Sequence, residues 1–109
     1  MVSIVNDRAR LSGQRVFAAM GWPPGQPITY STVGQIVAIR CAPPEKTRHA
    51  ISPLGQIRLP AAVRHATGVA AGDHILLTAW PSASMVALIP SRIVLEALAS
   101  TLTTMAGTA

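Results

Sequence analysis

The sequence predicts a mainly β protein with short helices, made of two copies of one small unit and followed by a C-terminal helix. Three observations indicate this fold class: an internal repeat, a supply of core residues that is aliphatic rather than aromatic, and turn-forming residues between short apolar runs. The 109 residues suit one compact domain. Half of them are hydrophobic and 12% are charged, which is a globular composition and not a disordered one.

The internal repeat relates residues 14–30 (QRVFAAMGWPPGQPITY) to residues 61–77 (AAVRHATGVAAGDHILL). Each copy has the pattern of a short apolar helix, a glycine that can end it in a left-handed conformation, a turn with a second glycine, and a β-like run. The alignment superimposes two glycine pairs and two aliphatic pairs, each 47 residues apart: Gly21 and Gly68, Gly25 and Gly72, Val16 and Val63, and Ile28 and Ile75.

A β-hairpin is expected to follow each helix. The first would join Pro27–Ser31 to Gln35–Arg40 near Thr32–Gly34, and the second would join His74–Ala79 to Met85–Ile89 across residues 81–84. A short strand should also precede each helix. These strands are expected at Arg8–Leu11 and at Gln56–Leu59, the latter stopped by Pro60 and paired with His49–Ser52.

These elements place the first copy at about residues 8–40 and the second at about 48–90, within a domain of residues 1–90. The linker Ala42–Lys46 should be stiff and polar. Residues 91–109 are expected to form a helix and tail, capped by Ser91. One face of that helix is apolar and is expected to pack against the body, with a partner-binding role as the alternative: Val94, Leu95, Leu98, Leu102 and Met105.

Nine basic residues against four acidic ones give a net charge of +5, and eight of the nine are arginines. A basic balance favours polyanions such as nucleic acid, or an anionic membrane surface. Cys41 is the single cysteine, so no intramolecular disulfide is expected and a reducing compartment is indicated. Because no apolar stretch suits a signal peptide or a membrane span, we expect a cytoplasmic protein with no membrane partner.

Several motifs lie in order along residues 55–77 of the second copy. They are a glycine, a strand ending in an aliphatic–proline pair, a short helix with an arginine, a second glycine, and a Gly-Asp turn into a strand: Gly55, Leu59-Pro60, Arg64, Gly68 and Gly72-Asp73. This segment resembles the AbrB/MazE/SpoVT swapped-hairpin family. The first copy resembles the same unit, keeping Gly21 and Gly25 but having Gly13 where Pro60 stands.

The resemblance implies a β-barrel of interleaved hairpins with two-fold symmetry, which in most family members needs two chains. Two units in one chain imply that this protein completes the barrel alone, with a homodimer as the other arrangement. Family members bind double-stranded DNA as transcription regulators or as antitoxins, through basic residues on the strand before the short helix and on that helix.

The resemblance also implies which residues would contact DNA. Arg64 matches an arginine that family members use, His65 stands where a second basic residue is frequent, and Gln56 stands where arginine often follows the glycine. Further basic candidates share the stretch around this motif, namely Arg58, Arg48 and Lys46. In the first copy Phe17 and Ala18 replace the basic pair, so the face would be lopsided unless other arginines balance it: Arg8, Arg10 and Arg15.

No cofactor, metal site or enzyme is expected. His49, His65 and His74 lack the spacing of metal ligands, and the four carboxylates lie at dissimilar places in the repeat. No nucleophile–base arrangement or phosphate-binding glycine loop is visible. We therefore expect a regulator that binds promoter DNA. The alternatives are an antitoxin that binds a toxin and represses its own operon, and a protein–protein interaction module that has lost DNA binding. The nearly uncharged segment after Glu96 argues against the antitoxin, because family antitoxins typically have an extended acidic tail.

Overall fold

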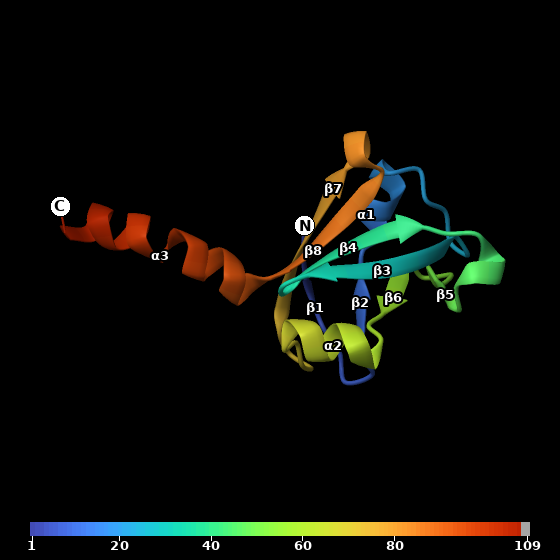
Figure 1. The fold of residues 1–109 in the computed structure, drawn as a ribbon, viewed down its shortest axis with the longest axis horizontal. Coiled ribbons are helices and arrows are strands. Elements are labelled where there is room, and N and C mark those ends of the chain that lie inside the picture. The colour runs from blue at the N-terminus through green and yellow to red at the C-terminus, as the bar shows by residue number, and fades with distance from the viewer. Residues whose placement is uncertain (108–109) are drawn as a thin grey trace.

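The computed structural model describes residues 1–107 and confirms a mainly β fold with short helices and a C-terminal helix (Figure 1). Two 3-10 turns, Pro44–Lys46 and Pro81–Ala83, join strands. The strands and α-helices follow in this order: β1 Val2–Ile4, β2 Arg10–Ser12, α1 Gln14–Ala19, β3 Pro27–Val33, β4 Ile36–Cys41, β5 His49–Ala50, β6 Gln56–Arg58, α2 Ala61–Thr67, β7 His74–Trp80, β8 Met85–Pro90 and α3 Ser91–Gly107.

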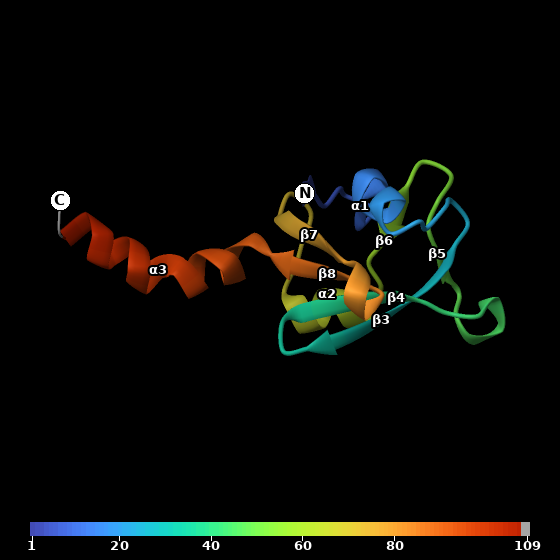
Figure 2. The same ribbon diagram turned by 90° about the horizontal axis from the view of Figure 1, so that it is seen from above.

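Six strands form one antiparallel sheet in the order β1-β7-β8-β4-β3-β5, and this sheet curls into a half-barrel (Figures 1 and 2). The remaining strands, β2 and β6, form a separate two-stranded ribbon. The element order β-β-α-β-β occurs twice. We call β1 to β4 with α1 the first half, and β5 to β8 with α2 the second half.

The two halves exchange strands symmetrically. The first strand of each half pairs with the hairpin of the other, since β1 pairs with β7 and β5 pairs with β3. The β4–β8 ladder is centred on Ala38 and Ala87, and the β2–β6 ladder on Leu11 and Ile57. The helices follow the same exchange, because α1 contacts β7 while α2 contacts β3 and β4.

Equivalent backbone hydrogen bonds fix how the halves align. The Gly25 N–H donates to the Ile51 carbonyl at 2.7 Å, and the Gly72 N–H donates to the Val5 carbonyl at 2.7 Å. Ile51 and Val5 in turn donate to Gln26 and Asp73, both at 3.0 Å. Equivalent residues are therefore 46 positions apart before each helix and 47 from the helix onward, since the second half has one extra residue at Leu59-Pro60.

The predicted helix ends are confirmed. Gly21 and Gly68 follow α1 and α2 with φ of +73° and +69°, a left-handed conformation in which a side chain would be strained. Val, Ile and Leu side chains from both halves make up most of the core. Two aromatic side chains also contribute, and the rings of Phe17 and Trp22 stack with their centroids 6.1 Å apart.

Two strand predictions were wrong. His49–Ser52 does not pair with Gln56–Leu59, because β5 pairs with β3 while β6 pairs with β2 to bury Ile57 beside Leu11. Only the turn between β5 and β6 forms, and there the Ser52 N–H donates to the Gln56 carbonyl at 2.9 Å. The first hairpin turns at Gly34 and Gln35 and not at Thr32–Gly34, since β3 continues through Val33.

The expected packing of the last helix against the body is also wrong. Helix α3 starts directly after β8, with no loop that would let it fold back, and it projects from the barrel (Figures 1 and 2). Leu95, Leu98 and Leu102 are 61%, 47% and 51% exposed. At its base, Arg92 donates to the Thr67 carbonyl at the end of α2 and to the Gln35 side chain.

No helix within residues 1–107 is long and apolar enough to cross a membrane. The last two residues of the predicted C-terminal segment, 108 and 109, lie outside the described residues.

Candidate nucleic-acid interface

The β2–β6 ribbon presents two arginines at one end. In both strands the central residue is inward and buried, Leu11 in β2 and Ile57 in β6, so the flanking side chains point outward. Arg10 lies directly opposite Arg58 in the antiparallel register. Side chains at such positions start about 4.5–5.5 Å apart at Cβ, and like charges there are destabilising. The ribbon therefore brings two positive charges together at its surface.

A third arginine joins this end through the turn that precedes β2. The Asn6 side-chain oxygen accepts hydrogen bonds from the backbone N–H groups of Arg8 and Arg10, at 2.9 and 3.0 Å. These bonds hold a tight turn in which Ala9 has φ of +60°. A depression of about 310 Å³ is lined by residues of this turn and of β2, β6 and α2: Asp7, Arg8, Ala9, Arg10, Arg58 and Arg64.

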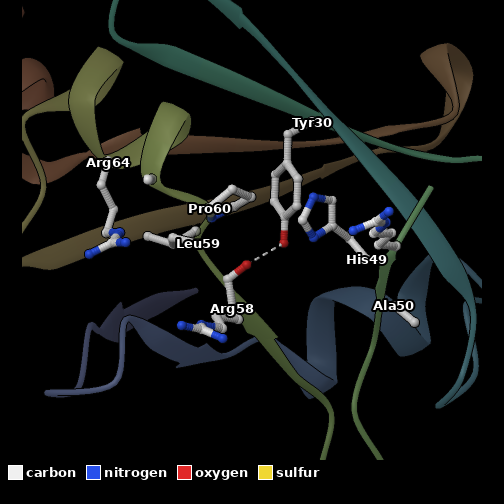
Figure 3. Close-up of a pocket in the computed structure, with 9 residues that line it drawn as sticks. Tyr30, His49, Ala50, Arg58, Leu59, Pro60 and Arg64 are labelled. Carbon is white, nitrogen blue, oxygen red and sulfur yellow. Dashed lines mark hydrogen bonds between the residues drawn. The ribbon is translucent and has the colours of Figure 1, made fainter.

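Helix α2 supplies Arg64. Val63 and Thr67 are four residues apart on one face of the helix, and both are buried. Arg64 and His65 lie on another face and are exposed. A second depression of about 490 Å³ shares Arg58 and Arg64 with the first and adds Arg48, directly before β5, and His49, the first residue of β5. In Figure 3 the guanidinium groups of Arg58 and Arg64 lie to one side of the Leu59-Pro60 backbone, and Tyr30 and His49 lie to the other.

Tyr30 holds the strand that presents Arg58. Its hydroxyl donates to the Arg58 carbonyl oxygen at 3.0 Å, and its ring makes an edge contact with His49 at 5.3 Å (Figure 3). Burial raises the pKa of the Tyr30 hydroxyl well above its ordinary value, so the group stays protonated and remains a donor. Because the bond uses the backbone of Arg58, the guanidinium group stays available.

We call five arginines at this end the basic face: Arg8, Arg10, Arg48, Arg58 and Arg64. Within residues 1–107, none of their guanidinium groups has a hydrogen-bond or ion-pair partner. Arg40 and Arg92 lie elsewhere and are bound internally, Arg40 to the Met85 sulfur and Arg92 as described above. Asp7 is the one carboxylate that lines the two depressions. The basic face therefore has a concentrated positive charge with little internal compensation.

The structure brings together only part of the predicted site. His65 adjoins Arg64 in a shallow depression at α2. Gln56 lies across from Ser12 on the ribbon and lines a depression of about 450 Å³ together with Arg10 and Arg58. Lys46 ends the 3-10 turn after β4, and Arg15 lies on α1, which is away from α2 in both ribbon views. Neither residue lines the depressions of the basic face.

The arginines of the first copy do not balance the face. Arg8 and Arg10 line the same depression as Arg58 and Arg64, because the antiparallel ribbon places the start of β2 beside the end of β6. They add to the charge at the end that holds Arg58 and Arg64, so the two ends of the ribbon differ more in charge. Sequence reasoning also missed Tyr30. The repeat offered a signal for it, because the equivalent residue in the second half is the buried Leu77, and a polar aromatic residue at a core position is unusual.

The corresponding surface of the first half is apolar. Five positions of the depression at α2 have equivalents 47 residues earlier that line a groove of about 320 Å³ at α1, with Phe17 in place of Arg64 and Ala18 in place of His65. We call it the apolar groove: Gln14, Phe17, Ala18, Gly21, Trp22, Pro23, Pro24, Ile51 and Gly55.

Comparisons with protein-family models, with curated proteins and with solved structures gave no match for this chain. Among residues 1–107, no group of three or more His, Cys, Asp or Glu side chains is placed to hold a metal ion.

Proposed function

We propose that this protein is a DNA-binding transcription regulator of the AbrB/MazE/SpoVT type, in which one chain supplies both halves of a swapped-hairpin barrel and binds promoter DNA through the basic face. The observation that best supports the proposal is the cross-strand pair of Arg10 and Arg58. Two like charges at this position oppose folding. A polyanion that lies across both of them would relieve that repulsion, and within residues 1–107 neither guanidinium group has an ion-pair partner.

The shape of the face suits duplex DNA. A two-stranded β-ribbon fits the major groove, where an arginine can donate two hydrogen bonds to the O6 and N7 atoms of guanine. In this arrangement Arg10 and Arg58 would reach base edges from the ribbon, since both side chains point outward. Arg8 and Arg64 flank the ribbon and would contact phosphates, which supply most of the affinity and fix the register.

The exchange of strands supports the swapped-hairpin assignment. The β1–β7 and β5–β3 pairs interleave the halves, and β4–β8 and β2–β6 join them about an approximate two-fold axis. That arrangement is what two interleaved hairpin units would produce within one chain.

Substitution of Arg64 tests the proposal, with Arg15 as a matched control. Both are exposed arginines on short helices, and each substitution by alanine removes one positive charge. Fluorescence anisotropy with a promoter duplex at several salt concentrations would give the affinity and its salt dependence. We expect Arg64→Ala to weaken binding and to make the slope of log affinity against log salt shallower by about 1, as for one lost phosphate contact.

Arg15→Ala should leave both the affinity and the slope close to those of the wild type. Equal effects of the two substitutions would mean that net charge, and not the basic face, drives binding. A wild-type protein with no affinity for duplex DNA at low salt would favour the interaction module instead.

A further inference from the structure

We propose that one chain recognises an asymmetric DNA site, because only one end of its approximately two-fold symmetric ribbon is built to contact DNA. The inference rests on the proposed function and adds the class of DNA sequence that the site accepts. It follows from a comparison of the basic face with the positions that the approximate two-fold axis makes equivalent to it.

The ribbon itself is unequal at its two ends. The axis passes through the Leu11–Ile57 pair, so it exchanges Arg10 with Gln56 and Arg58 with Ser12. One end of the ribbon therefore presents two guanidinium groups and the other presents an amide and a hydroxyl. An amide and a hydroxyl can hydrogen-bond to base edges, but they carry no charge, so they add nothing to the electrostatic attraction that dominates binding to phosphates.

The turns before β2 and β6 also differ in charge, and the charged turn lies at the end of the ribbon that holds the two arginines. Both turns are held by an equivalent hydrogen bond from a backbone N–H to a side-chain oxygen. The Arg10 N–H donates to the Asn6 side chain, and the Gln56 N–H donates to the Ser52 side chain, both at 3.0 Å. Arg8 at the tip of the first turn corresponds to Leu54 in the second, and Leu54 is 73% exposed. A charged tip thus flanks one end of the ribbon and an apolar tip flanks the other.

The helices complete the asymmetry. Arg64 on α2 corresponds to Phe17 on α1, whose side chain is 1% exposed and cannot reach a ligand. Arg48, before β5, corresponds to Val2 in β1. All five arginines of the basic face consequently have uncharged equivalents.

The consequence for DNA is geometric. A protein with two equivalent contact surfaces reads two equivalent half-sites, so the symmetry of its operator mirrors its own. Here the contacts of one end are absent from the other, and a second half-site would meet Leu54, Gln56 and Ser12. We therefore expect a single contacted half-site and one chain per site.

Selection of bound duplexes from a random library by the full chain tests this directly. We expect a motif with no internal two-fold symmetry, and native mass spectrometry of the selected complex should give one chain per duplex. Two pairs of variants then compare equivalent positions on that duplex. Arg10→Ala is matched with Gln56→Ala, and Arg58→Ala with Ser12→Ala.

We expect each arginine substitution to weaken binding by about 5- to 150-fold, the effect of losing a base contact. The matched substitutions at Gln56 and Ser12 should change affinity by less than about twofold. Arg58→Ala keeps the hydrogen bond from the Tyr30 hydroxyl, because that bond uses the backbone carbonyl of residue 58. A loss of affinity in this variant would therefore not be caused by loss of the contact that holds the strand.

A palindromic motif bound by two chains, or equal losses at Arg10 and Gln56, would overturn the asymmetric site while leaving DNA binding intact. Absence of any selected duplex at low salt would instead overturn the proposed function, and the asymmetric site with it.

Discussion

The two short helices occupy equivalent places in the barrel, but one serves packing and the other presents charge. On α1, Phe17 is buried, and its ring lies against Trp22 and close to Gly13 and Leu77. On α2 the equivalent residue is Arg64, which is exposed beside an open depression that includes Tyr30, the equivalent of Leu77. In the first half an aromatic ring thus fills the space beneath the helix, and in the second half that space remains open next to free guanidinium groups.

The comparison shows that the same backbone unit can contribute to folding stability at one helix and to ligand binding at the other. Burial of an aromatic side chain removes a large apolar area from water, which favours folding. An exposed arginine adds little to folding but keeps its charge available for a ligand. Helix α1 therefore stabilises the barrel, whereas α2, at the equivalent place, presents unpaired positive charge.

The largest effect that tests this division is expected for Phe17→Ala. Removal of the ring deletes the stacking on Trp22 and the packing beside Gly13 and leaves a cavity, so the free energy of unfolding should fall by about 3–5 kcal/mol. Arg64→Ala, at the equivalent position, should change it by no more than about 0.5 kcal/mol, as expected for an exposed residue. Urea denaturation of both variants gives the two values. Similar losses would show that the helices do not differ in this way.

An intermediate effect is expected for Gly13→Ala. A Cβ atom at Gly13 would lie 2.7 Å from the Phe17 ring, closer than packed atoms allow, and 3.1 Å from the Leu77 side chain, which is a tight contact. Because the φ of Gly13 is −138°, the cost is steric and not conformational. Overpacking of this kind should lower the free energy of unfolding by about 1–3 kcal/mol. Combination with Phe17→Leu, which frees space beside Gly13, should make the alanine less costly. A neutral Gly13→Ala would mean that the ring can move away freely.

The sequence was sufficient to predict the elements that have strong local signals. Glycines that end helices, aliphatic runs that form hairpins and the repeat itself all depend on residues close together in the chain, and the structure has the corresponding elements. Strand partners were harder. The ladders of β5 and β6 involve two and three residues, too short for an alternating pattern to specify a partner. Their pairing depends on where the whole barrel buries Ile57 and Leu11.

The candidate site was predictable only in part, for the same reason. The family-like motif indicated Arg64, and nearness to it in the sequence suggested Arg58 and Lys46. Lys46 does not line the basic face, whereas Arg58 lies beside Arg64. Arg8 and Arg10 are about 50 residues away from these two in the chain and join them only through the β2–β6 register. The leucine stripe of α3 likewise indicated an apolar face without specifying whether the barrel would cover it.

The smallest expected effect concerns the Arg10–Arg58 pair and connects stability to binding. In Arg58→Glu, a carboxylate would face Arg10 across the ribbon, so repulsion becomes attraction while the backbone acceptor for Tyr30 is kept. The free energy of unfolding should rise by about 0.2–1 kcal/mol at low salt, and the gain should shrink in about 1 M salt, where the Debye length falls to about 3 Å. Arg58→Gln, which removes the repulsion without adding attraction, should fall between the wild type and Arg58→Glu. The same Arg58→Glu variant should lose DNA binding, since it replaces a cation of the basic face with an anion. Paired urea denaturation and anisotropy measurements at two salt concentrations check both outcomes. A variant that is less stable than the wild type at low salt would show that these two side chains do not repel each other, and the main support for a polyanion ligand would be lost.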